Sequence, residues 1–198
     1  MTRVAHPILR LEVLRSDGTR DEQRRVFCRL QRQSVDADAC HACGHCDLVT
    51  RGPDAAIVCS IPRTREELTS DTTGDRTEVG AVLRRSVVAV DPATPIGDVL
   101  AVIHAEDRRS VAVVDAARSL VGVVHEVLFV EPRDPTEDVS QAMSSALALH
   151  ESTPLRRALR LLASAHLREA TVVDDAGVPL GIFRDVDGLR WLSAARRR

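Results

Sequence analysis

The five cysteines of this 198-residue chain are its most reactive side chains, and all of them lie between Cys28 and Cys59. Three form a C-x2-C-x2-C run, CHACGHC, at residues 40–46. The C-x2-C spacing lets two thiolates converge on one metal ion, and two more cysteines on flanking strands can complete a tetrahedral zinc site. We therefore expect a structural zinc ion bound by Cys28, Cys40, Cys43 and Cys59. Three further side chains could replace one of these ligands: Cys46, His41 and His45.

An iron–sulfur cluster is the main alternative to zinc, because C-x2-C-x2-C with a distant fourth cysteine also occurs in cluster-binding proteins. The ferredoxin-type run has a fourth cysteine soon after the third, normally followed by Pro, whereas Asp47, Leu48 and Val49 follow Cys46 here. Thiols without any metal are the third possibility. A catalytic zinc needs an open position and a nearby acid or base, and nothing in this segment nominates one.

Predicted strands at three places position these cysteines. Residues 8–14 alternate loosely in hydropathy, Val26–Cys28 is apolar and ends in the first cysteine, and Ala55–Cys59 ends in the last. A polar stretch from Pro62 to Thr77 has no hydrophobic period and is expected to be a linker. About 60 residues with so few apolar side chains would be marginally stable without a metal.

The composition narrows the classes of function. Hydrophobic residues make up 44% and charged residues 28%, which suits a packed core with a polar surface. A net charge of −2 and very few aromatic residues argue against a nucleic-acid partner. No stretch approaches the roughly 18 apolar residues of a membrane-spanning helix, and the N-terminal residues lack the apolar centre of a signal peptide. We expect a cytoplasmic protein, whose reduced thiols favour metal binding over disulfides.

The rest of the chain contains a gap-free internal repeat. The stretch SVAVVDAARSLVGVVHEVL at residues 110–128 recurs as ATVVDDAGVPLGIFRDVD at residues 170–187. Asp115 matches Asp174, and the pair Thr94-Pro95 matches Thr153-Pro154, each 59 positions later. Each copy predicts a strand, a helix that starts at Thr-Pro with Thr as N-cap, two paired strands and a final helix. Short leads at residues 79–83 and 139–143 are predicted helix entries.

This β-α-β-β-α order, the runs AVVD and TVVD, and the Gly-apolar-apolar segment before the last helix resemble the cystathionine-β-synthase-type (CBS) domain, present here as a pair. The resemblance implies an α+β fold in which two CBS repeats pack about a pseudo-twofold axis, preceded by a small metal-stapled, β-rich module. We expect this module at residues 1–62, a linker at 63–78, and repeats at 79–131 and 132–198.

The resemblance also implies clefts between the copies that bind adenosine compounds. The family motif continues Gly-apolar-apolar-Ser/Thr-x-x-Asp, where the hydroxyl meets phosphate and the Asp meets the ribose hydroxyls. His125 and Leu128 replace both groups in the first copy, whereas Arg184 replaces only the hydroxyl in the second copy and Asp187 matches. The resemblance therefore implies one competent cleft. Its expected residues are Asp187, Arg184, Thr94, Arg108, Arg109 and Ser110, with Arg168 as a weaker phosphate contact.

From these features we expect a non-enzymatic regulatory sensor or adaptor. Its CBS pair would form a homodimer and bind AMP, ADP, ATP or S-adenosylmethionine, and the metal module would be structural or would dock an unidentified protein partner. One alternative is a purely structural CBS dimer with degenerate nucleotide sites. The other is an iron–sulfur or redox protein.

Overall fold

The computed structural model describes residues 2–52, 54–61, 71, 73–105, 108–126 and 133–195. The N-terminal elements are β1 (Thr2–Pro7), β2 (Leu9–Leu14), β3 (Arg20–Cys28), β4 (Gln33–Asp36), the 3₁₀ helix η1 (Asp38–Ala42), β5 (Cys46–Val49) and β6 (Ala56–Ile61). The first repeat contains η2 (Val79–Val82), β7 (Val87–Val90), α1 (Ile96–Ala105), β8 (Ser110–Val114) and β9 (Leu120–His125). The second repeat contains η4 (Val139–Gln141), β10 (Ala148–His150), α2 (Leu155–Ser164), β11 (Glu169–Val173), β12 (Pro179–Arg184) and α3 (Asp185–Ala195).

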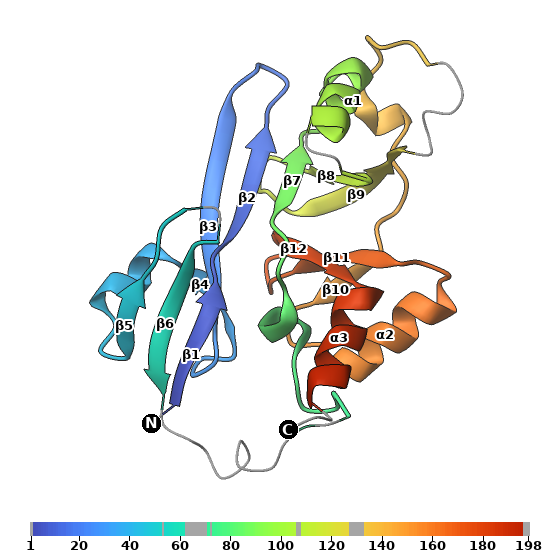
Figure 1. The fold of residues 1–198 in the computed structure, drawn as a ribbon. Coiled ribbons are helices and arrows are strands. Elements are labelled where there is room, and N and C mark those ends of the chain that lie inside the picture. The colour runs from blue at the N-terminus through green and yellow to red at the C-terminus, as the bar shows by residue number, and fades with distance from the viewer. Residues whose placement is uncertain are drawn as a thin grey trace.

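The described strands form three sheets (Figure 1). One has six strands in the order β4-β3-β2-β7-β8-β9, and two have three strands each, β1-β6-β5 and β10-β11-β12. The mixed α+β fold agrees with the expected CBS pair. The predicted strands and helices of both repeats are present, apart from the final helix of the first copy, which falls partly on residues 127–132, outside the described residues.

The N-terminal segment shares a sheet with the first repeat. Strand β2 pairs in parallel with β7, with Leu11 opposite Val87, so β2 joins the β3–β4 side of the sheet to the repeat. Leu11 and Val87 are both buried, and they share one apolar cluster with Val13 and Ala89. The segment and the first repeat are therefore joined by backbone hydrogen bonds as well as by the chain, whereas the domain boundaries at 62 and 78 remain a prediction.

The end of the β3–β4 hairpin also packs on the second repeat. Glu151 is buried, and its two carboxylate oxygens accept hydrogen bonds from the backbone N–H of Ser34 at 3.0 and 2.8 Å. A Cβ added at Gly80 would lie 2.5 Å from a ring carbon of Phe27, which shows how closely this ring covers η2. A buried carboxylate needs such donors, because leaving it without them costs a large desolvation penalty.

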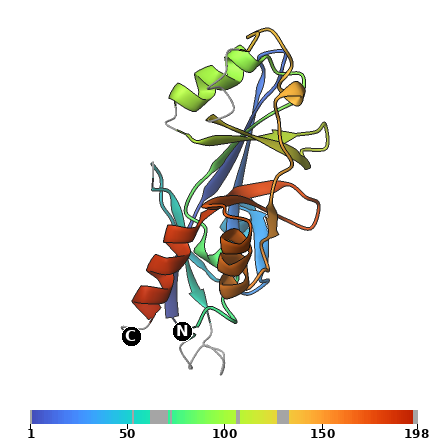
Figure 2. The same cartoon turned by 90° about the vertical axis from the view of Figure 1, so that its right-hand side faces the viewer.

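The leads of the two repeats are exchanged in space. Val79 in η2 belongs to the apolar cluster of the second repeat with Leu155, whereas Val139 in η4 belongs to the cluster of the first repeat with Val99. Each lead thus completes the core of the other copy, and the two repeats bury their apolar faces together. Figure 2 shows the two repeats stacked one above the other, with α2 and α3 side by side in the lower one.

The exchanged leads also satisfy the first N–H groups of the helices. The N–H of Ile96 donates to the carbonyl of Glu137 at 2.8 Å, and that of Leu155 donates to the carbonyl of Thr77 at 2.8 Å. Helix α2 has Pro154 at its N-cap and no side-chain capping bond, so the predicted capping role of Thr153 is wrong. Backbone carbonyls from the other lead replace the expected hydroxyl, since free N–H groups at a helix start need an acceptor.

Candidate functional site

The junction between the repeats is built around two residues at equivalent positions, Ser110 and Glu169. Each begins the middle strand of its copy, and the Ser110 hydroxyl donates to Glu169 Oε1 at 2.6 Å. Arg184 lies opposite Glu169 in the β11–β12 register, and its Nε is 3.3 Å from Glu169 Oε2. The two copies therefore meet at this contact, and one carboxylate has a partner in each copy.

An open pocket of about 390 Å³ lies at this junction. Its lining includes five arginine and histidine side chains from both copies: Arg109, His125, His166, Arg168 and Arg184. Two carboxylates offset part of this charge, since Arg184 meets Glu169 and Arg168 Nη1 lies 3.9 Å from Asp185 Oδ2. Guanidinium groups bind phosphate through forked N–H donors, so the pocket suits an anionic group.

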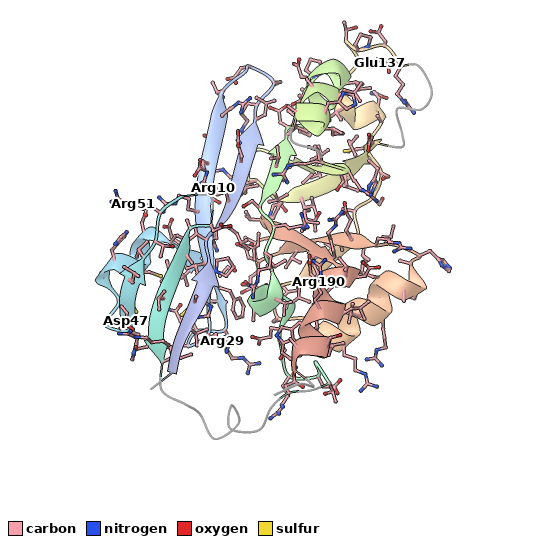
Figure 3. The ribbon with its side chains drawn as sticks, viewed as in Figure 1. Arg10, Arg29, Asp47, Arg51, Glu137 and Arg190 are labelled. Carbon is pink, nitrogen blue, oxygen red and sulfur yellow. The ribbon has the colours of Figure 1, made fainter. Side chains whose placement is uncertain are left out.

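Asp187 lies in the first turn of α3 and is absent from the lining of this pocket. Its carboxylate meets Arg85 Nε at 3.7 Å and Arg190 Nη1 at 3.5 Å, and the side chain is 14% exposed. Figure 3 labels Arg190 on α3. Asp187 thus faces the segment that leads into β7, a segment that belongs to the other copy.

The structure brings together only part of the set expected from the sequence. Arg109, Arg168 and Arg184 share the junction pocket. Thr94 is buried and its hydroxyl donates to Asp91 at 3.2 Å, so it does not line this pocket.

Arg108 and Ser110 were expected at the nucleotide site, whereas Arg85 was not. Arg108 donates to the Ser86 carbonyl at 3.0 Å, and Ser110 is engaged by Glu169. Arg85, the partner of Asp187, was not expected. The Arg84-Arg85 pair directly before an apolar strand was the available signal, because two charges there must face a cleft or solvent.

The surroundings of Asp187 are strongly basic. Burial of the imidazole, followed by the charges of Arg29 and Arg84, lowers the pKa of His6 to about 4, so His6 is neutral at neutral pH. Burial and the charge of Arg29 lower the pKa of Arg84, while Asp187 opposes this shift. Figure 3 shows Arg29 beside the lower part of β1, on the side toward the second repeat. One carboxylate here faces several guanidinium groups, which again suits an anionic ligand.

Leu128 of the first copy lies outside the described residues. His125, which stands in the hydroxyl position of that copy, ends β9 and lines the junction pocket. The sequence therefore has Leu128 in the first copy where the second copy has Asp187. His125 and Arg184, which replace the hydroxyl residue of the family motif in the two copies, both line the same pocket.

The five cysteines gather at a second place, between η1 and the strands β3, β5 and β6. Four of them line a cavity of about 30 Å³ together with His45: Cys28, Cys40, Cys43 and Cys59. His41 is exposed, and His45 Nδ1 lies 3.3 Å from the carbonyl of Ser60. In the described part of the chain, no three Cys, His, Asp or Glu side chains are already arranged to hold a metal ion. The donor chemistry suits a soft metal, but the thiol side chains would have to turn toward one another.

Comparisons with known proteins match the repeats. No curated protein matches the chain. Among solved structures, CBSX2 in complex with AMP is 25% identical, with a TM-score of 0.53 over 61% of this chain and 98% of that one. The cytosolic domain of the Mg²⁺ channel MgtE in complex with ATP is 26% identical, with a TM-score of 0.53 over 58% of this chain and 48% of that one.

A third structure, a CBS domain pair/ACT domain protein from Thermotoga maritima, is 20% identical, with a TM-score of 0.52 over 60% of this chain and 98% of that one, and shows the fold alone. No helix within the described ranges has the length and apolar character to cross a membrane. The family profile described as "CBS domain" matches twice, at residues 79–130 and 137–194, which together are more than half of the chain. The chain therefore belongs to the CBS-domain family and carries a tandem pair of CBS domains.

Proposed function

We propose that this protein is a non-enzymatic regulator whose CBS pair binds a phosphorylated adenosine nucleotide at the junction of the two repeats. The observation that carries the proposal is the basic pocket lined by Arg109, Arg168 and Arg184, with Asp187 three residues after Arg184 in the first turn of α3. Asp187 would accept the ribose hydroxyls, and the guanidinium groups would bind the phosphates. The AMP and ATP complexes of CBSX2 and MgtE support this class of ligand.

The charges favour a nucleotide over S-adenosylmethionine. The three arginines of the pocket and the pair Arg84 and Arg85 beside Asp187 are only partly offset by Glu169 and Asp185. An anion is attracted to such a surplus, whereas the sulfonium of S-adenosylmethionine is repelled. The affinity should therefore rise with the number of phosphates and fall with added salt.

In this proposal the N-terminal segment is a zinc-stapled module that is structural or docks a partner protein, in a cytoplasmic protein whose thiols stay reduced. The CBS pair would assemble as a homodimer, as the family resemblance implies. Val186 and Leu189 of α3 are exposed at 38% and 55%, and their burial against a second copy would support that assembly. Light scattering with size-exclusion chromatography measures the oligomeric state.

Isothermal titration calorimetry of the full chain with AMP, ADP, ATP and S-adenosylmethionine tests the ligand. We expect binding of at least one phosphorylated nucleotide and weaker binding of S-adenosylmethionine. Adenosine without phosphate separates the ribose contacts from the phosphate contacts. Absence of heat with every ligand at millimolar concentration would remove the sensing function.

A purely structural CBS dimer is the second candidate, and one observation favours it. Asp187 already has two cationic neighbours, Arg85 and Arg190, and Arg184 already meets Glu169. Internal partners of this kind can replace a ligand in a degenerate site. This candidate predicts a dimer whose melting temperature is the same with and without nucleotides.

A further inference from the structure

The cysteines come from elements in two different sheets. Cys28 ends β3 of the six-stranded sheet, whereas Cys46 begins β5 and Cys59 lies in β6 of the β1-β6-β5 sheet. Cys40 lies in η1, and Cys43 follows directly at the C-cap of that helix. All five thiols are free, so no disulfide competes for them.

The register of β5 and β6 places Cys46 directly opposite Cys59. The N–H of Ser60 donates to the carbonyl of His45 at 2.9 Å, so the hydrogen bond flanks the pair and does not join it. Cys46 and Cys59 therefore form a non-hydrogen-bonded antiparallel pair, the type in which the Cα atoms are about 4.5 Å apart and the side chains lie closest. The side chains of Cys46 and Cys59 therefore share one face of the sheet.

That face is the one that carries the small core of the segment. Cys40 is a buried member of the apolar cluster with Ile8, Val26 and Ile57, and both Cys46 and Cys59 pack against this cluster. Cys43, by contrast, is exposed. A structural zinc site is enclosed by its protein ligands, which fits the buried Cys40 and the half-buried Cys28, Cys46 and Cys59 better than the exposed Cys43.

We propose that Cys28, Cys40, Cys46 and Cys59 bind one zinc ion and that Cys43 stays outside the coordination sphere. The proposal deepens the zinc-stapled module of the proposed function, and it replaces Cys43 by Cys46 in the set expected from sequence spacing. The ion would join the end of β3 to β5 and β6. It would thereby fasten the β1-β6-β5 sheet to the sheet that contains the first repeat.

The residues that line the cavity favour a different ligand set, since they include Cys43 and not Cys46. Cys43 borders this cavity but is exposed to solvent. The strand register fixes the backbone positions of Cys46 and Cys59 independently of how the thiols are turned. A ligand set depends on where the thiols can meet, so the register is the stronger evidence.

Elemental analysis of the full chain, purified from zinc-supplemented cells, tests the ligand set. We expect one zinc per chain in the unmodified protein and in Cys43→Ser, and a loss of at least tenfold in zinc affinity in Cys46→Ser. Exchange of zinc for Co²⁺ should give the intense visible absorption of tetrahedral thiolate ligands in the first two proteins. Loss of zinc in Cys43→Ser with retention in Cys46→Ser would overturn the proposal.

A measurement without substitutions guards against a variant that does not fold. Brief alkylation of the native protein, followed by mass spectrometry, should label Cys43 and protect the other four cysteines until a chelator is added. Equal labelling of all five, a Cys46–Cys59 disulfide, or the brown colour of an iron–sulfur cluster would each contradict the zinc site. Nucleotide titration of the same sample separates this failure from failure of the CBS proposal, because the two ligands bind at different places.

Discussion

Ser110 and Glu169 are 59 positions apart in the chain, occupy the same place in the two repeats, and are joined by a hydrogen bond of 2.6 Å. The hydrogen bond joins the first residues of β8 and β11, so the middle strands of the two copies meet here. The two copies contribute different groups to this contact, because one supplies a hydroxyl and the other a carboxylate. The junction pocket is therefore asymmetric at its centre.

Replacement of Glu169 tests how much this contact stabilises the pair. Glu169→Ala removes the acceptor of Ser110 and the partner of Arg184, and we expect a loss of about 1–3 kcal/mol in the free energy of unfolding. Ser110→Ala should cost about 0.5–1.5 kcal/mol. Urea denaturation measures both, and a non-additive double variant would confirm the coupling. Equal stability of Glu169→Ala and the unmodified protein would contradict it.

Substitution of Gly80 tests whether the N-terminal segment is packed on the second repeat. The new Cβ in Gly80→Ala would lie 2.5 Å from the Phe27 ring and 3.2 Å from Glu151 Cβ. Both neighbours would have to move, and overpacking of this kind costs about 1–3 kcal/mol. Gly44→Ala is the matched control, since nothing lies within 4 Å of its added Cβ. If thermal unfolding shows the same stability for both variants, the packing of Phe27 on η2 is wrong.

The carboxylate of Asp71 gives a prediction on pH. Burial alone would raise its pKa, but the hydrogen bonds from the Thr77 hydroxyl and from the backbone N–H groups of Arg76 and Thr77 outweigh burial and lower the pKa to about 2. The pKa is lower in the folded state than in the unfolded state. The ionised group therefore stabilises the fold above about pH 4, and this contribution is lost as the pH falls toward 2.

Asp71→Asn measures this contribution. We expect the variant to be about 1–2 kcal/mol less stable than the unmodified protein at pH 7, and the difference to shrink steadily below about pH 4. The loop matters because the carbonyls of Gly74 and Thr77 accept the first N–H groups of α2. A difference that is constant between pH 7 and pH 2 would show that ionisation of Asp71 is not the cause.

The strands and helices of the repeats could be predicted closely from the sequence, because the same pattern of apolar and polar residues occurs twice without gaps. The final helix is found at Asp185–Ala195, at the end of the second copy, where the repeat order predicts it. Pairings between distant segments could not be predicted. The exchange of η2 and η4 between the copies depends on which core each lead fills, and a sequence pattern carries no information on that choice.

The N-terminal strands were only partly predictable. Strand β3 begins at Arg20, but its first six residues are polar and half of their side chains are exposed, so only Val26–Cys28 has an apolar signal. Strand β5 contains Cys46, Asp47 and two apolar residues, too few for a period to show. Its register with β6 is what brings Cys46 beside Cys59, and this pairing depends on tertiary structure.

The proposed nucleotide site was also only partly predictable from the sequence. Arg184 and Arg168 were predictable because the repeat aligns them with family positions, whereas the Asp187–Arg85 contact required the exchanged lead. Asp98 is a control residue for Asp187, because it also lies in the first turn of a helix, is exposed, and is not among the residues of the pocket. Loss of either carboxylate removes a similar favourable interaction with a helix N-terminus, about 0.3–1 kcal/mol.

Calorimetric titration of AMP into the full chain and into Asp187→Asn and Asp98→Asn tests the central claim most directly. We predict that Asp187→Asn weakens binding by at least tenfold, about 1.4 kcal/mol, because the ribose loses its acceptor. Asp98→Asn should bind AMP as the unmodified protein does. Equal binding by Asp187→Asn and the unmodified protein, or no AMP binding by any of the three, would contradict the account.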